Sequence, residues 1–523
     1  MKRTRAKRSL LCMTLLALAA TACSKPSESS SPNPSSSAPA GTATQTAEQA
    51  DPFGKYDPPL QLHIARYVGQ QVKYPAGDDL DNNIWTREYE NTLGIQLITD
   101  WTANDGDYFK KLNVTIASGS LPESFIVDAS QLKQLADAGQ LEDLTEAFDK
   151  YASPFTKELM NGDGGAAMNS ATFGGKLLAI PHINATIYGA DVLWIREDWR
   201  KKLNLPEPKT MEDVFKISEA FAKQDPDGNN KNDTYGLAMN KDIYGGIASI
   251  KGFANGYHAY PQSWVKDASG RVVYGSVQPE MKAVLAKLQE MYKNGQIDKE
   301  FGVKDGGKVG DSFATNKLGM EFGANWNPYY PLADGVKKNP DMEWKPYAIP
   351  SIDGTPAKAS TGFSAYEYFV VRKGVKNPEA IVKLLNLAQE KLYGKTREEK
   401  YLKVTENGEL IETQNYIFVN SGLGNTQAVH TMEVLRDALN KKDKSLTEGV
   451  GGEADKYDAV LNYMDTKNIE NWGTYHQFAA FEVMLSSYAG TNLLPTEFGG
   501  QTPTMAEKWS TLDKLEKEAF TKI

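Results

Sequence analysis

The segment Leu60-Gln-Leu-His-Ile-Ala65 opens a regular succession of strands and helices, and this order indicates the fold class. Its apolar side chains stand at alternate positions, which predicts a β-strand. Residues 80–93 have the spacing of a helix, and Gly94 follows as a helix-ending residue. A second strand begins at Ile95, and residues 108–118 form the next amphipathic helix.

The alternation continues with an apolar strand at 124–128 and a helix at 130–138. Such an order predicts an α/β fold in which a parallel sheet carries helices on both faces. A second alternating region runs from about 190 to 320 and contains the strand 191–196, so we expect two lobes. Other segments are predicted to be mainly helical: 279–293, 375–390, 396–408, 427–441, 454–466, 473–489 and 503–521.

The composition limits the classes of function. A chain of 523 residues exceeds one ordinary domain, and 40% hydrophobic with 24% charged residues is typical of a soluble globular protein. The net charge of −9 argues against a nucleic-acid partner, which requires a basic surface. Two cysteines exclude a disulfide scaffold, and five scattered histidines argue against a zinc hydrolase. Neither a Gly-x-Ser-x-Gly elbow nor a His-Glu-x-x-His motif is present.

The N-terminal segment indicates export. Residues 1–22 combine a basic start with an apolar run at 10–20, which is typical of a signal peptide and too short to span a bilayer. The run ends in Ala20-Thr-Ala-Cys23, which resembles a lipobox whose cysteine is diacylated. Residues 23–55 then form a Ser/Pro-rich flexible tether. The alternative is an ordinary cleavage site with an incidental cysteine.

Several segments together resemble the extracellular solute-binding proteins of ABC importers, and in particular their large oligosaccharide-binding branch, which includes the alginate-binding proteins. The segments that carry this resemblance occur in order along residues 58–523, and they are 113–125, 175–181, 193–199, 209–214, 319–332 and 511–516.

The resemblance implies two α/β lobes joined by crossing hinge segments, with the ligand in the cleft between them. By this resemblance the first lobe comprises 56–183 and a returning segment at 327–365. The second lobe comprises 188–322 and most of 366–523.

Ligand contacts are expected where aromatic and amide side chains stand at these crossings, because sugars present apolar faces and hydroxyl edges. The family often has an aromatic residue at the position of Trp326, which makes it the leading candidate. Strand ends add further candidates, since open α/β sheets bind ligands there. For most of these side chains, core packing or helix capping is the alternative. The predicted ligand-binding residues are Trp326, Asn325, Tyr329, Tyr188, Asn184, Tyr366, Glu367, Arg66, Asp128 and Trp264.

One loop has the spacing of a metal site. Oxygen side chains stand at its positions 1, 3, 5 and 9, and a backbone carbonyl at position 7, which suits Ca²⁺. It departs from an EF-hand because position 12 is Gly236. It resembles the calcium loop of the alginate-binding group, except that Thr234 replaces an acidic residue. A polar turn is the alternative. The predicted ligands of a structural Ca²⁺ are Asp225, Asp227, Asn229, Lys231 and Asp233.

These observations predict a monomeric binding protein, not an enzyme, that is lipid-anchored at the extracellular face of the cytoplasmic membrane. It would capture an oligosaccharide or another small solute and deliver it to an ABC permease. Two alternatives stay open: a secreted carbohydrate-active enzyme, whose paired carboxylates need only spatial proximity, and a surface lipoprotein without a transport role.

Overall fold

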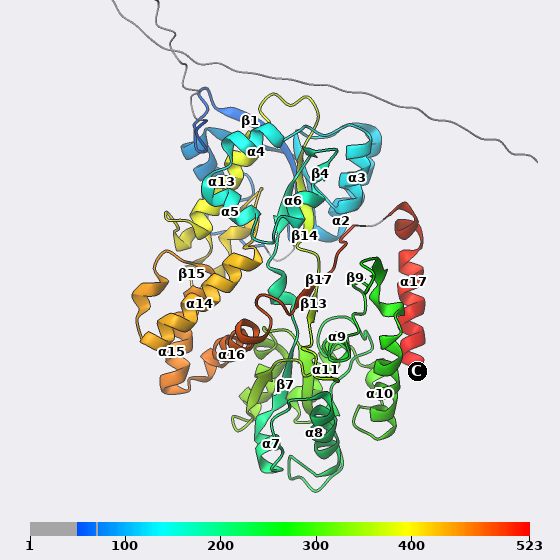
Figure 1. Cartoon of the computed structure of the whole chain (residues 1–523). Coiled ribbons are helices and arrows are strands. Elements are labelled where there is room, and N and C mark those ends of the chain that lie inside the picture. Colours follow the sequence, from blue (N-terminus) through cyan, green and yellow to red (C-terminus); the bar gives the residue numbers. More distant parts are fainter. Residues whose placement is uncertain (1–49, 70–71, 501) are drawn as a thin grey trace, which may run out of the picture. The chain divides into compact units, whose positions relative to one another are not determined.

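The computed structural model describes residues 50–69, 72–500 and 502–523. The predicted signal peptide, Cys23 and most of the tether lie outside the described residues. The described residues belong to one compact unit, within which two separate hydrophobic cores define two lobes. Figure 1 shows the elements of both lobes in sequence colours.

The first lobe is built on a five-stranded mixed sheet. Its strand β1 pairs in parallel with β2 and β3, and β14 runs antiparallel to both β3 and β6. In sheet order the strands are β2 (Ile95–Ala103), β1 (Leu60–Tyr67), β3 (Ser124–Val127), β14 (Ala365–Val371) and β6 (Ile180–Ile183).

Helices cover this sheet as the alternation predicts. Gly94 ends the first helical segment in the left-handed conformation, with φ 64°, which confirms its predicted role. The segments are α1 (Ile84–Glu88), the π-helical turn Tyr89–Leu93, α2 (Asp105–Ser118), α3 (Ala129–Asp137), α4 (Thr145–Tyr151), α5 (Pro154–Met160), α6 (Ala166–Ser170) and α13 (Ala380–Tyr393).

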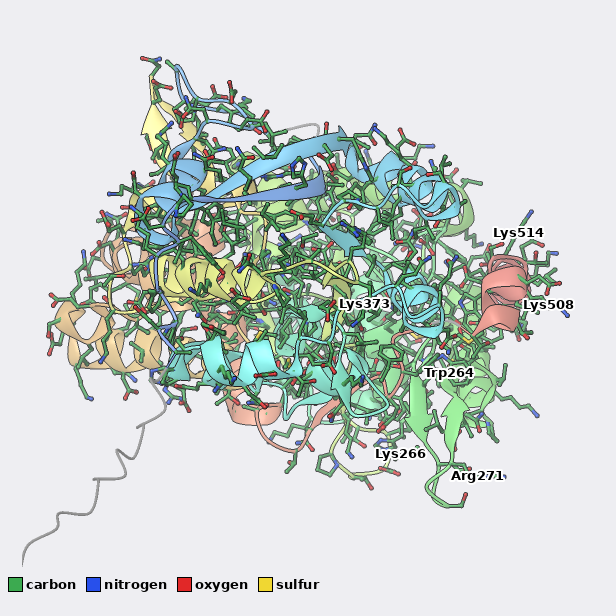
Figure 2. All side chains as sticks on the ribbon, turned by 90° about the horizontal axis from the view of Figure 1, so that it is seen from above. Trp264, Lys266, Arg271, Lys373, Lys508 and Lys514 are labelled. Carbon is green, nitrogen blue, oxygen red and sulfur yellow. The ribbon has the colours of Figure 1, made fainter. Side chains whose placement is uncertain are left out.

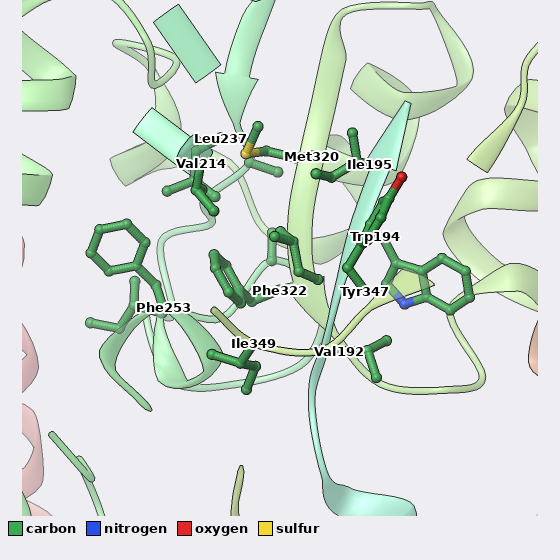
Figure 3. Packing of buried hydrophobic residues seen from close by; sticks show 14 of the residues in the cluster. Val192, Trp194, Ile195, Val214, Leu237, Phe253, Met320, Phe322, Tyr347 and Ile349 are labelled. Carbon is green, nitrogen blue, oxygen red and sulfur yellow. The ribbon is translucent and has the colours of Figure 1, made fainter. Parts of the chain in front are cut away.

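The second lobe is built on a four-stranded sheet around strand β7, all of whose side chains are buried. Trp194, Phe322 and Phe253 belong to one hydrophobic cluster there, in which the Phe253 ring meets the Phe322 ring edge-on with centroids 5.9 Å apart (Figure 3). Only β8 and β11 pair in parallel, so this sheet is mixed rather than parallel. In sheet order its strands are β12 (Trp344–Tyr347), β7 (Val192–Arg196), β11 (Leu318–Gly323) and β8 (Tyr235–Leu237).

The helices of the second lobe include one predicted boundary that the structure confirms. The Thr210 side chain accepts from the Asp213 backbone N–H at 3.2 Å and caps α8. The helices are α7 (Glu197–Lys202), α8 (Met211–Lys223), α9 (Lys251–Asn255), α10 (Glu280–Lys293), α11 (Gly306–Ala314), α12 (Ala333–Lys338), α16 (Trp472–Ser487) and α17 (Pro503–Lys522).

Two further helices, α14 (Asn425–Lys441) and α15 (Tyr457–Thr466), share a small core of their own. A hairpin of β9 (Trp264–Lys266) and β10 (Val272–Tyr274) lies beside α17, where Tyr274 meets Trp509 edge-on at 4.9 Å. Figure 2 shows this hairpin from above, with Arg271 at its tip and Lys508 on the neighbouring helix.

The chain passes between the lobes three times. The first crossing leads from β6 to β7 through residues 184–191, and the second from β12 to β14 through β13 (Ala359–Thr361). The third leads from the first-lobe core, which includes Val419, into α14. The strand β17 (Leu493–Pro495) pairs in parallel with β13, so the C-terminal segment also contacts the hinge (Figure 1).

The returning segment expected at 327–365 requires correction. Residues 344–347 form β12, which pairs with β7 of the second lobe. The first lobe instead receives β14 and α13, and it keeps the chain to Val419 in its core. The expectation fails because the resemblance located the crossings but not which sheet the intervening strand joins.

The helix expected at 396–408 is also wrong. This segment forms a short 3₁₀ turn and the hairpin β15 (Val404–Glu406) to β16 (Glu409–Ile411). Asn407 and Gly408 connect the strands, and both have positive φ angles, 52° and 81°. An Asn-Gly pair is the preferred two-residue hairpin turn, and here it overrides the helical spacing.

Among the residues that the structure describes, none of the helices is both long enough and apolar enough to cross a membrane.

Candidate functional site

A cavity of about 330 Å³ lies where the first two crossings meet the second lobe, and we call it the hinge cavity. The crossings contribute Tyr188 and Thr361, and the loop after β11 contributes Trp326. Its other lining residues are Gly189, Asp191, Tyr244, Gly246, Ser249, Lys251, Pro261, Gln262, Ser263, Ala324, Ser360, Gly362 and Thr496.

Trp326 lines this cavity, and 44% of its surface is exposed. A fully buried carboxyl group supports its loop from beneath. Glu321 Oε1 accepts from Asn327 Nδ2 at 2.9 Å, and Oε2 accepts from the Ala248 backbone N–H at 3.2 Å. Glu321 thereby joins two loops around the cavity.

Asn325, a predicted ligand residue, has a structural role instead. It is 1% exposed, its Nδ2 donates to the Tyr188 carbonyl at 2.9 Å, and its Oδ1 accepts from Gln477 Nε2 at 2.8 Å. Because both ends of the amide are already paired, Asn325 fixes the first crossing to the Trp326 loop and to α16.

Polar groups around the hinge cavity are available to a hydroxylated ligand. In the described part of the chain, the buried hydroxyl oxygens of Tyr244 and Thr361 have no hydrogen-bond partner. Lys251 and Asp191 supply a cation and a carboxyl group, and burial raises the pKa of Asp191 to about 6. Such a mixture of one aromatic face with several convergent polar groups is typical of small-molecule sites.

A second cavity, of about 230 Å³, opens in the first lobe at the carboxyl end of β1, and we call it the Arg66 cavity. Glu367 is 4% exposed there and accepts from His182 Nδ1 and from the Tyr67 hydroxyl, each at 3.1 Å. Tyr366 is 50% exposed, and its ring centroid lies 4.8 Å from that of His182. The remaining lining residues are Arg66, Ile126, Phe369, Gln414, Asn415, Ile417, Phe418 and Asn420.

The crossings hold the two cavities close together. Gly362 lines the hinge cavity and Tyr366 lines the Arg66 cavity, so the chain runs only four Cα-to-Cα steps from one to the other. An extended chain covers about 3.5 Å per residue, which limits these Cα atoms to roughly 14 Å apart. His182 and Tyr188 connect the same two cavities along the first crossing.

Four other predicted ligand residues lie elsewhere or have other partners. Asp128 caps α3 by accepting from the Gln131 N–H at 2.8 Å. Trp264 packs against Trp509 of α17, with ring centroids 6.1 Å apart. The Tyr329 hydroxyl bonds to Gln477 of α16 at 3.0 Å. Asn184 is exposed and lines a third cavity with Tyr188.

The predicted calcium loop connects α8 to β8 and is held by its own side chains. Asp225 accepts from the backbone of Asn229 and Asn230 at 3.0 Å. Asn229 Nδ2 donates to Asp227 at 2.7 Å and to Asp233 at 3.1 Å. Burial, and then the neighbouring Asp225, raise the pKa of Asp227. Among the described residues, no three acidic, histidine or cysteine side chains converge closely enough to hold a metal ion.

The structure explains why Thr234 departs from the calcium loop of the alginate-binding group and why Gly236 departs from the EF-hand. Thr234 is 3% exposed and donates to the Phe221 carbonyl at 2.8 Å, so it caps α8 rather than facing the loop. Gly236 packs against α8, where a Cβ atom would collide with Ser218. A glutamate at this position is therefore sterically excluded.

Several residues of the site were not predicted from the sequence. Lys251, Tyr244 and Thr361 line the hinge cavity, and Asn420 lines the Arg66 cavity. Asn420 comes from a segment beyond the β15–β16 hairpin, and no local pattern marks it. Of these unpredicted residues, only His182 could have been proposed from the sequence, because it stands in a strand that leads directly into the first crossing.

Two sheet-based lobes, three crossings and a polar cavity with an exposed indole at the hinge define a two-lobed binding protein. A family model for bacterial extracellular solute-binding proteins matches residues 71–391, which is more than half of the chain. The chain therefore belongs to this family. Its members bind solutes and are not enzymes.

Individual relatives are more distant. The lipoprotein LipO of Bacillus subtilis (strain 168) is 26% identical over 239 residues, which are 44% of each chain. YtcQ of the same organism, a polygalacturonan/rhamnogalacturonan-binding protein, is 26% identical over 241 residues, 45% of this chain and 46% of that protein. The chain thus matches less than half the length of these relatives.

Solved structures share the fold. The substrate-binding protein FusA of Streptococcus pneumoniae, in complex with kestose, superposes with a TM-score of 0.51 at 16% identity, over 88% of this chain and 96% of that one. An EF-hand mutant of FusA, in complex with fructo-nystose, gives a TM-score of 0.50 at the same identity and coverage.

The buried carboxyl group of Glu321 makes stability depend on pH. Burial, and secondarily Asp191, raise its pKa to about 8 from 4.5. As the pH rises through this interval, the unfolded chain ionises while the native carboxyl stays protonated, so native stability falls. At about 1.4 kcal/mol per pKa unit, the loss reaches roughly 5 kcal/mol above pH 8.

We therefore expect Glu321→Gln, which is neutral at every pH, to match the wild type at pH 4 and to exceed its melting temperature at pH 8.5. Thermal melts across this range measure the difference, with Glu212→Gln as the control because Glu212 is exposed on α8. Parallel curves for wild type and Glu321→Gln would contradict the buried, protonated state.

Proposed function

We propose that the protein is the extracellular substrate-binding component of an ABC import system and that it captures an oligosaccharide between its lobes. The observation that carries this proposal is the exposed indole of Trp326 beside unpaired hydroxyl groups in the hinge cavity. An indole stacks on the apolar face of a sugar ring, while hydroxyl and amide groups pair with its edges. The sugar ligands of YtcQ and FusA support an oligosaccharide for this chain.

The crossings explain how capture leads to delivery. The hinge cavity belongs to the second lobe and the crossings, and the Arg66 cavity to the first lobe, so a ligand several sugar units long contacts both. Contacts that form only when the lobes approach stabilise the closed state by their differential affinity. The permease subunits then select the closed, loaded form.

The test of this function is Trp326→Ala. Loss of a buried aromatic anchor costs about 2 kcal/mol or more in binding, which is roughly thirtyfold in Kd. The melting temperature should change little, because the side chain is 44% exposed. Calorimetric titration with the oligosaccharide that co-purifies from the native host measures Kd for the wild type and for Trp326→Ala.

Tyr329→Ala is the matched control. Tyr329 is 46% exposed and lies three residues further along the chain, but it faces α16. Equal affinities for wild type and Trp326→Ala, or equal losses in both variants, would overturn the assignment of Trp326 as the anchor.

We further propose that the loop after α8 binds a structural Ca²⁺. Asp225, Asp227, Asp233, the Asn229 amide oxygen and the Lys231 carbonyl oxygen form the hard oxygen donor set that this ion prefers. Support comes from the Asn229 amide, which lies against Asp227 and Asp233 where a cation would neutralise both. Because Thr234 and Gly236 add no carboxylate, we expect affinity at the weak extracellular end, about 10⁻⁴–10⁻³ M.

A bound ion stabilises only the native state, by about 2.7 kcal/mol at one hundred times Kd. Calcium should therefore raise the melting temperature of the wild type, and Asp227→Ala should abolish most of this rise without loss of ligand binding. Asp137→Ala, at an exposed site on α3, is the control. A melting curve insensitive to both calcium and EDTA, with no ion in elemental analysis, would leave only a polar turn.

The proposal includes an anchor at the outer face of the cytoplasmic membrane, through a diacylated Cys23 and the tether that follows it. The small residues before Cys23 and the lipoprotein LipO among the relatives support it. Cys23→Ser should move the mature protein from the membrane fraction into the soluble fraction. Identical fractionation of wild type and variant would refute the anchor.

A further inference from the structure

Arg66 is a buried cation whose guanidinium group is only partly satisfied. It is 4% exposed, and one nitrogen, Nη2, donates to the Tyr416 carbonyl at 2.8 Å. Burial lowers the pKa of Arg66, but an arginine keeps its charge in proteins. In the described part of the chain, Arg66 forms no ion pair, although thirty-six such contacts occur there.

A buried charge without a partner costs several kcal/mol, so its position needs an explanation. The fold pairs most other buried charged groups: Arg196, which is 1% exposed, binds Asp198 through two nitrogens at 2.9 and 2.7 Å. Arg66 differs because, in the described part of the chain, it forms no such ion pair and lines a cavity. Its Nη2 has a protein acceptor, the Tyr416 carbonyl, and the side chain is one of those that line the cavity.

The charge of Glu367 does not serve as the missing partner. Both its carboxylate oxygens lie 3.1 Å from the Tyr67 hydroxyl, and Oε1 also pairs with His182 Nδ1. These contacts occupy both carboxylate oxygens of Glu367, and among the described residues Glu367 forms no ion pair with Arg66. Arg66 is therefore the cation in this cavity that is left for a ligand.

Other groups in the same cavity indicate what surrounds the anion. The buried Asn420 Oδ1 has no partner among the described residues and is a hydrogen-bond acceptor of the kind that pairs with a hydroxyl group, and Gln414 and Asn415 offer further amides. Tyr366 supplies a half-exposed aromatic face. At about 230 Å³ the cavity is smaller than the roughly 300–1,000 Å³ of complete ligand sites, so it holds one part of a longer ligand.

We propose that the Arg66 cavity binds the carboxylate of a uronic acid unit, so that the substrate class of this receptor is an acidic oligosaccharide. The planar guanidinium fork matches a planar carboxylate through two parallel hydrogen bonds. Asn420, Gln414 and Asn415 would pair with the hydroxyl groups of the same sugar. This proposal rests on the proposed function, because it names the chemistry of the ligand that the same cleft receives.

The experiment changes the ligand first, so that it does not depend on the folding of a variant. Trisaccharides of galacturonate, glucuronate, mannuronate and guluronate are each compared by calorimetry with their carboxyl-reduced counterparts, which differ only in having –CH₂OH for the carboxylate. For the uronate that binds, we expect the reduced form to bind about tenfold to a hundredfold more weakly, as for loss of a charged hydrogen bond.

Variants then assign the effect to one side chain. Arg66→Gln should lose a similar factor for the acidic trisaccharide and change little for the reduced form, whereas Arg66→Lys should fall between. Arg271→Gln, at an exposed site on the β9–β10 hairpin, is the matched control and should bind like the wild type. Melting curves show whether each variant is folded.

The outcomes separate the two proposals. Binding of reduced or neutral trisaccharides with equal or higher affinity than the uronates would overturn the acidic substrate class and leave the sugar receptor standing. Equal losses of Arg66→Gln for acidic and reduced forms would overturn the role of Arg66. Failure of every saccharide to bind a folded wild type would overturn the proposed function together with this inference.

Discussion

The buried amide of Asn325 joins the segments on which the hinge depends. One end holds the carbonyl of Tyr188 in the first crossing, and the other holds Gln477 in α16. The loop that carries Trp326 is thus fixed to the same two elements. Because leaving such a buried group unpaired costs about 1–3 kcal/mol, the three segments keep their relative positions or lose them together. Glu321 adds a second hydrogen bond to the same loop, which it accepts from Asn327 Nδ2.

The sequence predicted those elements whose signals are local. Alternation around Leu60, the closing Gly94 and the capping pair of Thr210 and Asp213 act within one or two turns of chain, and each was found where expected. Sheet membership is not local. The strand 344–347 could join either sheet by its own pattern, and its pairing with β7 is decided by contacts with residues about 150 positions away.

The same distinction applies to the site. Trp326 was predicted because it stands among aromatic and amide side chains at an expected crossing, where the resembling family often has an aromatic residue. Asn325 belongs to that run but faces inward, and only the structure shows that both ends of its amide are occupied. Lys251 and Asn420 reach their cavities from separate segments. Their positions follow from the crossings and not from any motif around them.

The pairing of strands that are far apart in the sequence also affects when the molecule can fold. Strand β3 pairs on one side with β1 and on the other with β14, which begins at Ala365. A growing chain that has not reached β14 leaves β3 as an open sheet edge, the kind of edge that pairs with other molecules. The sheet of the first lobe therefore becomes complete only after β14 is made, and its folding rate depends on the closure of a long loop rather than on the formation of individual helices.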